Sequence, residues 1–251
     1  MRAAIRAANT SADADVITFN IAPAGPKTIS VGAGANNQLP VVTGSDVIID
    51  ATSQPGGGAH GIRLDDPDVG GGENGLVLEG SRITIRGFAI TRFDGRGILV
   101  WNGSSERIQG NWIGTADGVS DQGTVDDGIR FQGGGSSVVG GSGSGEGNLI
   151  SGSDNDGIEI TDSNNNTVTG NMVGLTADGL SRLPNASSGI EINGTGSNNR
   201  VGGLSPGERN YASGNDGIGV QMLGILQADG SCKAPEYNVV QGNYLGLDAN
   251  G

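Results

Sequence analysis

A glycine followed by alternating apolar residues recurs along most of the chain, and this repeat constrains the fold more than any other feature. The motif reads NGLVLE, RGILVW, DGIRFQ, DGIEIT, SGIEIN and DGIGVQ, with its glycines at positions 75, 97, 128, 157, 189 and 217. Successive glycines are therefore 22, 31, 29, 32 and 28 residues apart. A second motif, GNWIG, GNMVG and GNYLG, alternates with the first. A repeat of this length indicates a solenoid.

The apolar pattern within each motif has the period of a β-strand. In GIEI, Ile158 and Ile160 point to one side and Glu159 to the other. The shortest repeat holds three such segments, LVLE, ITIR and FAIT, and no helical period continues past residue 9. Three short strands per turn, stacked ~4.8 Å apart, bury a continuous apolar column. The sequence therefore predicts an all-β, right-handed parallel β-helix.

The predicted organisation is one domain over residues 1–251, with an N-terminal cap and first rungs in 1–50 and regular rungs in 74–251. Residues 3–9 are expected to form a short amphipathic capping helix with Ile5 as its apolar contact. A helix there would cover the exposed edge of the first rung. Because the last repeat stops halfway, at GLDANG, we expect the chain to be a fragment of a longer protein.

Longer segments interrupt the rungs at regular places. Segments 115–126 and 176–188 follow third strands, whereas 140–147 and 202–209 lie between second and third strands. They recur in every second rung, so equivalent loops should stack ~10 Å apart, and such loops usually carry the function of a solenoid. Asparagines at the tight corners are expected to hydrogen-bond in a ladder. These are Asn111, Asn148, Asn171 and Asn243.

Charge and cysteine content exclude several classes of partner. Fourteen Lys+Arg against 27 Asp+Glu give a net charge of −13, which disfavours nucleic acid and anionic membranes. No apolar run approaches the ~18 residues of a membrane span, so no membrane insertion is expected. The single cysteine, Cys232, cannot form an intrachain disulfide, and the sequence assigns it no role. We expect a secreted or cell-surface protein whose signal peptide lies outside this chain.

Several segments together resemble a known class of proteins. They are RAAIRAAN, DVITFNI, LPVV followed by DVIIDATSQPG, and the recurring DGIxI and GNxIG with a following ADG. The chain resembles bacterial surface and secreted parallel β-helix repeat proteins with a Ser-Leu-Arg-Glu-Ala-type N-terminal segment, which are pectate-lyase-like solenoids. Here Met1-Arg2-Ala3-Ala4 stands where that class has Leu-Arg-Glu-Ala. The resemblance implies fold and export, but adhesins, structural proteins and carbohydrate-active enzymes share such repeats.

Outward positions of the first strand in each rung form a predicted column. It reads Val77, Leu99, Arg130, Glu159, Glu191 and Gly219. With the acidic residues before the glycines, this column supplies candidates for catalysis and for metal binding. The catalytic candidates are Asp127, Arg130, Asp156, Glu159 and Glu191. The metal candidates, for which Ca²⁺ is the possible ion, are Asp126, Asp127, Asp156 and Asp216.

Three interpretations of this acidic stripe compete. Two carboxylates could act as acid and base in glycosidic hydrolysis. Arg130, with Ca²⁺ on a uronate, could serve a polysaccharide lyase. The favoured interpretation is structural, in which the aspartates form turns and the charges solvate the face.

Two other side chains and one insert could take part in binding. Trp101 could stack on a sugar, although the favoured interpretation places it under the N-terminal segment. His60 is interpreted as a loop residue without a role, and segment 222–237 carries apolar residues that could contact another subunit or domain.

The leading prediction is a non-catalytic extracellular module with a structural, adhesive or filament-forming role. Its partners would be carbohydrate or copies of itself, and no cofactor is expected apart from possible Ca²⁺. The alternative is a polysaccharide lyase or glycoside hydrolase that acts along the acidic face.

Overall fold

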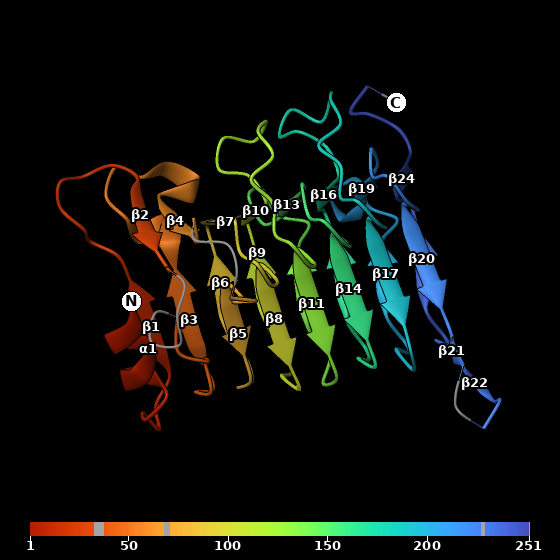
Figure 1. The fold of residues 1–251 in the computed structure, drawn as a ribbon, viewed down its shortest axis with the longest axis horizontal. Helices are drawn as coiled ribbons and strands as arrows, with labels where there is room; N and C mark the ends of the chain where they lie inside the picture. Colours follow the sequence, from red (N-terminus) through yellow and green to blue (C-terminus); the bar gives the residue numbers. More distant parts are fainter. Residues whose placement is uncertain (33–37, 68–70, 227–228, 251) are drawn as a thin grey trace.

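Three short strands per turn wind the chain into a right-handed parallel β-helix (Figure 1). The structure is a computed structural model that describes residues 1–32, 38–67, 71–226 and 229–250. The strands form three parallel sheets, here called sheets 1, 2 and 3 in the order in which a rung visits them. The predicted fold class is confirmed.

The bounds of the strands follow the predicted repeat. Sheet 1 contains β5 (Leu76–Leu78), β8 (Ile98–Trp101), β11 (Ile129–Gln132), β14 (Ile158–Thr161), β17 (Ile190–Asn193) and β20 (Val220–Leu223). Sheet 2 contains β1 (Asp15–Thr18), β3 (Val47–Asp50), β6 (Thr84–Arg86), β9 (Arg107–Gln109), β12 (Val138–Gly140), β15 (Thr167–Thr169), β18 (Arg200–Gly202) and β23 (Val239–Gln241). Sheet 3 contains β2 (Lys27–Ser30), β4 (Ile62–Asp65), β7 (Phe88–Thr91), β10 (Trp112–Ile113), β13 (Leu149–Ile150), β16 (Met172–Val173), β19 (Tyr211–Ala212) and β24 (Tyr244–Leu245).

Aliphatic side chains from all three sheets meet inside the coil and form its core. In sheet 1, Ile129 pairs in register with Ile98 on one side and Ile158 on the other, and Ile158 pairs with Ile190. All four are fully buried. Burying one such side chain stabilises the fold by ~1.5–3 kcal/mol, so the stack of rungs is held by many similar increments.

The glycine before each sheet 1 strand is required by the close approach of neighbouring rungs. A Cβ atom on Gly128 would lie 2.7 Å from the carbonyl oxygen of Gly157, and one on Gly157 would lie 2.7 Å from that of Gly189. Any side chain at these positions would push two rungs apart. The glycine that marks the repeat in the sequence is therefore a steric necessity of the stacking.

The last rung departs from the predicted column. Gly219, and not Gly217, takes the place of the rung glycine, since Ile190 N donates to Gly219 O. Glu191 consequently pairs with Gln221, so the expectation that Gly219 lies in the outward column is wrong. Ile218 is 54% exposed instead of joining the inward file. The shift is two residues, so the inward and outward faces of β20 keep their parity.

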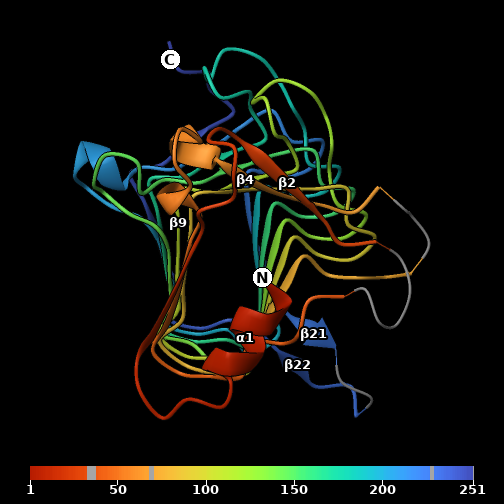
Figure 2. The same cartoon turned by 90° about the vertical axis from the view of Figure 1, so that its left-hand side faces the viewer.

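A short helix covers the N-terminal end of the coil. Helix α1 (Arg2–Ala8) lies across that end in the view along the axis (Figure 2), and its Ile5 is fully buried. The predicted cap is confirmed. Three 3₁₀ turns occur elsewhere, η1 (Ala51–Ser53), η2 (Gly58–His60) and η3 (Pro206–Glu208).

A ladder of buried asparagines runs along the corner that precedes sheet 3. Asn148 Nδ2 donates to Asn171 Oδ1 at 2.9 Å, and Asn171 Nδ2 donates to Asn210 Oδ1 at 3.0 Å. Asn111 and Asn243 extend the ladder at its two ends. The predicted ladder is therefore present, with Asn210 as a further member.

The long loops stack on one side as predicted, with β10 and β16, which precede two of them, separated by one strand, and the loops also touch each other directly. Ala177 N donates to Gly118 O at 2.8 Å, and Ala249 N donates to Gly179 O at 3.0 Å. In Figure 1 these loops project together above the strands. The insert at 222–237 forms an antiparallel hairpin of β21 (Ile225–Leu226) and β22 (Cys232–Lys233), with Cys232 exposed and unpaired; residues 227–228 lie outside the described part. No helix in the described residues has the length and apolar character of a membrane span.

Candidate functional site

The predicted acidic stripe converges on one compact cluster on sheet 1. Asp127, Asp156 and Glu159 each present a carboxylate oxygen, and these oxygens lie within 4.8 Å of one another. The register of β11 with β14 sets Arg130 opposite Glu159, and Arg130 Nη1 lies 2.6 Å from Glu159 Oε2. We call these four residues the carboxylate cluster. Stacking of neighbouring rungs therefore brings together residues 29 to 32 positions apart.

Neighbouring protein groups donate hydrogen bonds to each carboxylate of the cluster. Asp127 Oδ1 accepts from Asn155 Nδ2 at 2.8 Å, and Asp156 Oδ1 accepts from the backbone N of Ser188 at 2.7 Å. Glu159 Oε1 accepts from the Thr161 hydroxyl at 2.7 Å. The three carboxylates are at most 5% exposed, so their polar atoms serve the fold and not the solvent.

Burial and mutual repulsion shift the pKa values of Asp127 and Glu159 in opposite directions. Burial, together with the negative charge of Glu159, raises the pKa of Asp127 to about 8. Burial acts against the ionised form of Glu159 as well, but hydrogen bonds from Asp127 and Thr161 and the charge of Arg130 lower its pKa below the ordinary value. At neutral pH Asp127 therefore holds a proton beside an ionised Glu159.

This arrangement could in principle supply an acid and a base, because paired carboxyls with divergent pKa values do so in hydrolases. A substrate must reach both groups, however, and Asp127 is fully buried. The cluster also fits Ca²⁺ poorly, since the Arg130 guanidinium lies 2.6 Å from Glu159 and 3.5 Å from Asp127, where it supplies the positive charge that an ion would bring. The geometry favours the structural interpretation.

The remaining acidic candidates lie outside the cluster. Glu191 stacks on Glu159 in register, and Asn193 Nδ2 donates to both, at 2.9 and 2.7 Å, which relieves their repulsion. Asp126 pairs with Arg96 at 2.5 Å. Asp216 pairs with exposed Arg182 at 2.6 Å and belongs to no common site with the other metal candidates.

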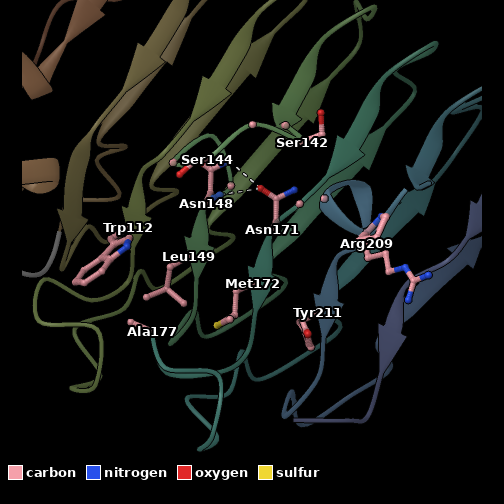
Figure 3. A pocket seen from close by; sticks show the side chains of 17 residues that line it. Trp112, Ser142, Ser144, Asn148, Leu149, Asn171, Met172, Ala177, Arg209 and Tyr211 are labelled. Carbon is pink, nitrogen blue, oxygen red and sulfur yellow. Dashed lines mark hydrogen bonds between the residues drawn. The ribbon is translucent and has the colours of Figure 1, made fainter. Parts of the chain in front are cut away.

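A groove that the sequence interpretation did not identify lies over sheet 3 (Figure 3). Its floor is the file of outward side chains on adjacent strands, Trp112, Leu149, Met172 and Tyr211, which pair in register. The loop at 141–147 and residues 206–209 form one wall, and Ala177 lies on the other side. The groove has a volume of about 430 Å³, within the range of ligand sites. We call this the aromatic groove.

Each end of the aromatic groove is an aromatic stack. His60, at the end of the turn η2, stacks on Trp112 with ring centroids 4.1 Å apart. Tyr211 stacks on Tyr244 with centroids 4.6 Å apart and an interplanar angle of 19°. That spacing matches the distance between adjacent strands, so the two rings are stacked along the solenoid axis with their planes roughly perpendicular to it. The face of Tyr211 away from Tyr244 is directed along the groove.

The groove continues past Trp112 into a second hollow. This hollow of about 460 Å³ shares Trp112, Ser144 and Gly147 with the first and extends to His60. The wall loop between them is closed on itself, because Glu146 Oε2 accepts from the backbone N of Gly143 at 2.8 Å. Buried Asn148 and Asn171 of the ladder line the groove from behind (Figure 3).

The sequence did carry a signal for this groove. Trp112, Met172 and Tyr244 occupy the third position of GNWIG, GNMVG and GNYLG, and Tyr211 has the same place after Asn210. Strand alternation sends that position outward when the next residue is in the core.

Trp101 lies on β8 of sheet 1 and is 48% exposed, so the interpretation that the N-terminal segment covers it is wrong.

Comparisons with known proteins add little to this geometry. No family model matches the chain, and no curated protein matches it. Among solved structures, the chain is similar to the A-module of mannuronan C-5 epimerase AlgE6 from Azotobacter vinelandii, with 13% sequence identity and a TM-score of 0.35. The match covers 96% of this chain and 80% of that one. A likeness this weak carries no argument about function.

Proposed function

We propose that this protein is a non-catalytic β-helix module that binds carbohydrate in the aromatic groove. The observation that carries the proposal is the pair of aromatic residues, Trp112 and Tyr211, at the two ends of an apolar floor formed by Leu149 and Met172. Secretion or display at the cell surface belongs to the same proposal, because polysaccharides are the partners that such a site would meet there.

The chemistry of the groove suits a sugar. Aromatic faces carry partial negative charge and pack against the C–H faces of a pyranose ring. The walls supply backbone groups of glycines and the hydroxyls of Ser142 and Ser144, which can hydrogen-bond to sugar hydroxyls. From Trp112 to Tyr211 the floor crosses three strand spacings, or ~14 Å. This length accommodates a short stretch of a glycan chain laid along the solenoid axis.

The groove offers binding groups without a catalytic pair. Glu146 is the one carboxylate among the described residues that line the two hollows, and it is engaged by Gly143. A close pair of carboxylates, Asp127 with Glu159, is buried on sheet 1. Binding and acid–base groups thus lie on different sheets, which argues against the alternative of a lyase or hydrolase acting along the acidic face.

The second candidate role is self-association into a structural assembly. It is favoured by the exposed apolar side chains of β20 and β21, Leu223, Ile225 and Leu226. Replacing Leu226 by Ser should then reduce the molar mass measured by light scattering at high protein concentration. A mass that stays that of the monomer for the unchanged protein would remove this role.

The carbohydrate proposal is tested by affinity electrophoresis through gels that contain xylan, β-glucan, galactan, polygalacturonate or alginate. At least one polymer should retard the protein, and Trp112→Ala should weaken that binding roughly tenfold, as the loss of one stacked ring implies. Trp101→Ala is the matched control, because it removes an exposed tryptophan from sheet 1. Equal loss in both variants, or no retardation by any polymer, would contradict the proposal.

A further inference from the structure

Arg209 lines the C-terminal end of the aromatic groove without a carboxylate partner. Most arginines of the chain pair with an acid, as Arg130 does with Glu159 and Arg182 with Asp216. Among the described residues, no Asp or Glu oxygen lies within 4.0 Å of the Arg209 guanidinium. In a chain with 27 acids and 14 bases, an arginine left unpaired beside a groove needs an explanation.

The guanidinium is nevertheless held in place. Arg209 Nη1 donates to the Tyr244 hydroxyl at 2.9 Å, and Cζ lies 5.4 Å from the centroid of the Tyr244 ring. Tyr244 in turn stacks on Tyr211, which forms the end of the groove floor. Tyr244 therefore holds the cation beside the C-terminal end of the groove, Tyr211 supports Tyr244, and the charge is left unneutralised. Its Nε is buried without an acceptor, so the group is also short of hydrogen-bond partners.

The nearby acids are committed elsewhere. Glu208 Oε1 lies 3.0 Å from Arg200 Nη1, and its Oε2 accepts from the backbone N of Ser205 at 3.2 Å. Glu146 closes its own loop through Gly143. Neither carboxylate competes with a ligand for Arg209. The overall charge of −13 acts mainly at long range, and salt at physiological strength screens exposed charges beyond ~8 Å.

We propose that the glycan in the aromatic groove is acidic, and that a carboxylate of a uronic acid unit pairs with the terminal nitrogens of Arg209. This inference rests on the proposed function and names the substrate class of the same site. A planar guanidinium matches a carboxylate with two parallel hydrogen bonds, which a neutral sugar cannot provide. The adjoining ring of Tyr211 is placed to pack against the sugar that carries the carboxylate.

The experiment compares polygalacturonate, alginate and hyaluronate, each beside its carboxyl-reduced form, which keeps the sugar rings and loses the charge. Binding is measured by titration calorimetry at 0.15 M salt. At least one native polymer should bind roughly tenfold more tightly than its reduced form. Arg209→Gln should abolish that preference and leave the weaker binding of the reduced polymer unchanged. Arg209→Lys, which keeps the charge without the planar fork, should restore only part of it.

Arg107→Gln is the matched control, since Arg107 is exposed on sheet 2 and the substitution makes the same change in net charge. If the control lowers binding as much as Arg209→Gln, long-range charge explains the effect and the inference is overturned. If native and reduced polymers bind equally, the groove binds sugar but not through a carboxylate, so the inference fails while the proposed function stands. If the protein binds none of these polymers in either form, both fail.

Discussion

Sheets 1 and 3 are built from the same coil, yet their outward faces behave in opposite ways. On sheet 1, charged side chains of neighbouring rungs meet in register and neutralise one another, as Arg130 and Glu159 do. On sheet 3, the outward file is aromatic and apolar, and it lies between walls of glycine and serine. The comparison teaches that a column of charged side chains in a solenoid can serve to pair neighbouring rungs and leave no group for a ligand. The surface left available for a ligand is the one whose outward side chains are aromatic and apolar and cannot form ion pairs with the next rung.

The largest expected effect is on the stability of sheet 1. Arg130→Ala leaves the buried Glu159 carboxylate without its cation, so the free energy of unfolding should fall by about 3 kcal/mol. Urea unfolding at pH 7 measures this change. Arg182→Ala removes an exposed pair with Asp216 and should cost at most ~1 kcal/mol. Similar losses in the two variants would mean that the cluster is not a buried network.

A second effect on stability is expected from the proton that Asp127 holds beside Glu159. Asp127 has a folded pKa of about 8 against an ordinary 3.8, so between about pH 5 and pH 8 the folded state holds a proton that the unfolded state has released. Stability should therefore fall as pH rises through this window. Asp127→Asn keeps the oxygen that accepts from Asn155 and provides a permanent donor to Glu159, so it should flatten that slope.

The measurement is the midpoint of urea unfolding at pH 5, 6, 7 and 8 for both proteins. Asp216→Asn serves as the control, because Asp216 is exposed and outside the cluster. It should leave the slope unchanged. A variant at position 127 with the slope of the unchanged protein would show that Asp127 is ionised throughout this range.

The smallest expected effect is at the end of the aromatic groove. The Tyr211 hydroxyl makes no hydrogen bond to any described residue, whereas its ring stacks on Tyr244. Tyr211→Phe should change the free energy of unfolding by less than ~0.5 kcal/mol and preserve glycan binding. Tyr211→Ala should weaken binding roughly tenfold. Calorimetric titration of both variants, with thermal unfolding as a check on folding, would separate the ring from its hydroxyl.

The sequence was sufficient to predict the coil because the rung glycines and the alternating aliphatic residues serve one geometric need. Ile129 and Ile158 each follow a rung glycine directly, and both side chains point into the core. The same rule failed in the last rung, where DGIGV offers two glycines and the structure uses Gly219. The local pattern does not say which of two glycines places its carbonyl against the previous rung. The backbone hydrogen bonds between the stacked rungs decide this.

The candidate site was less predictable, since a site depends on what surrounds a residue. Strand alternation placed Asp127, Arg130 and Glu159 near one another, and the structure brings them together. Alternation could not show that the cluster is buried. It also gave no reason to prefer Trp112 over Trp101, because both are outward; the walls beside Trp112 come from loops two rungs apart in sequence.

The asparagine ladder has a direction. Each amide from Asn111 to Asn210 donates to the next asparagine toward the C-terminus, and each also donates to a backbone carbonyl of an earlier rung. The small dipoles of these amides thus add head to tail behind the groove, and each bond polarises the next. One amide cannot turn over alone without setting donor against donor. The ladder therefore favours one register, in which the corner of every rung has the same orientation.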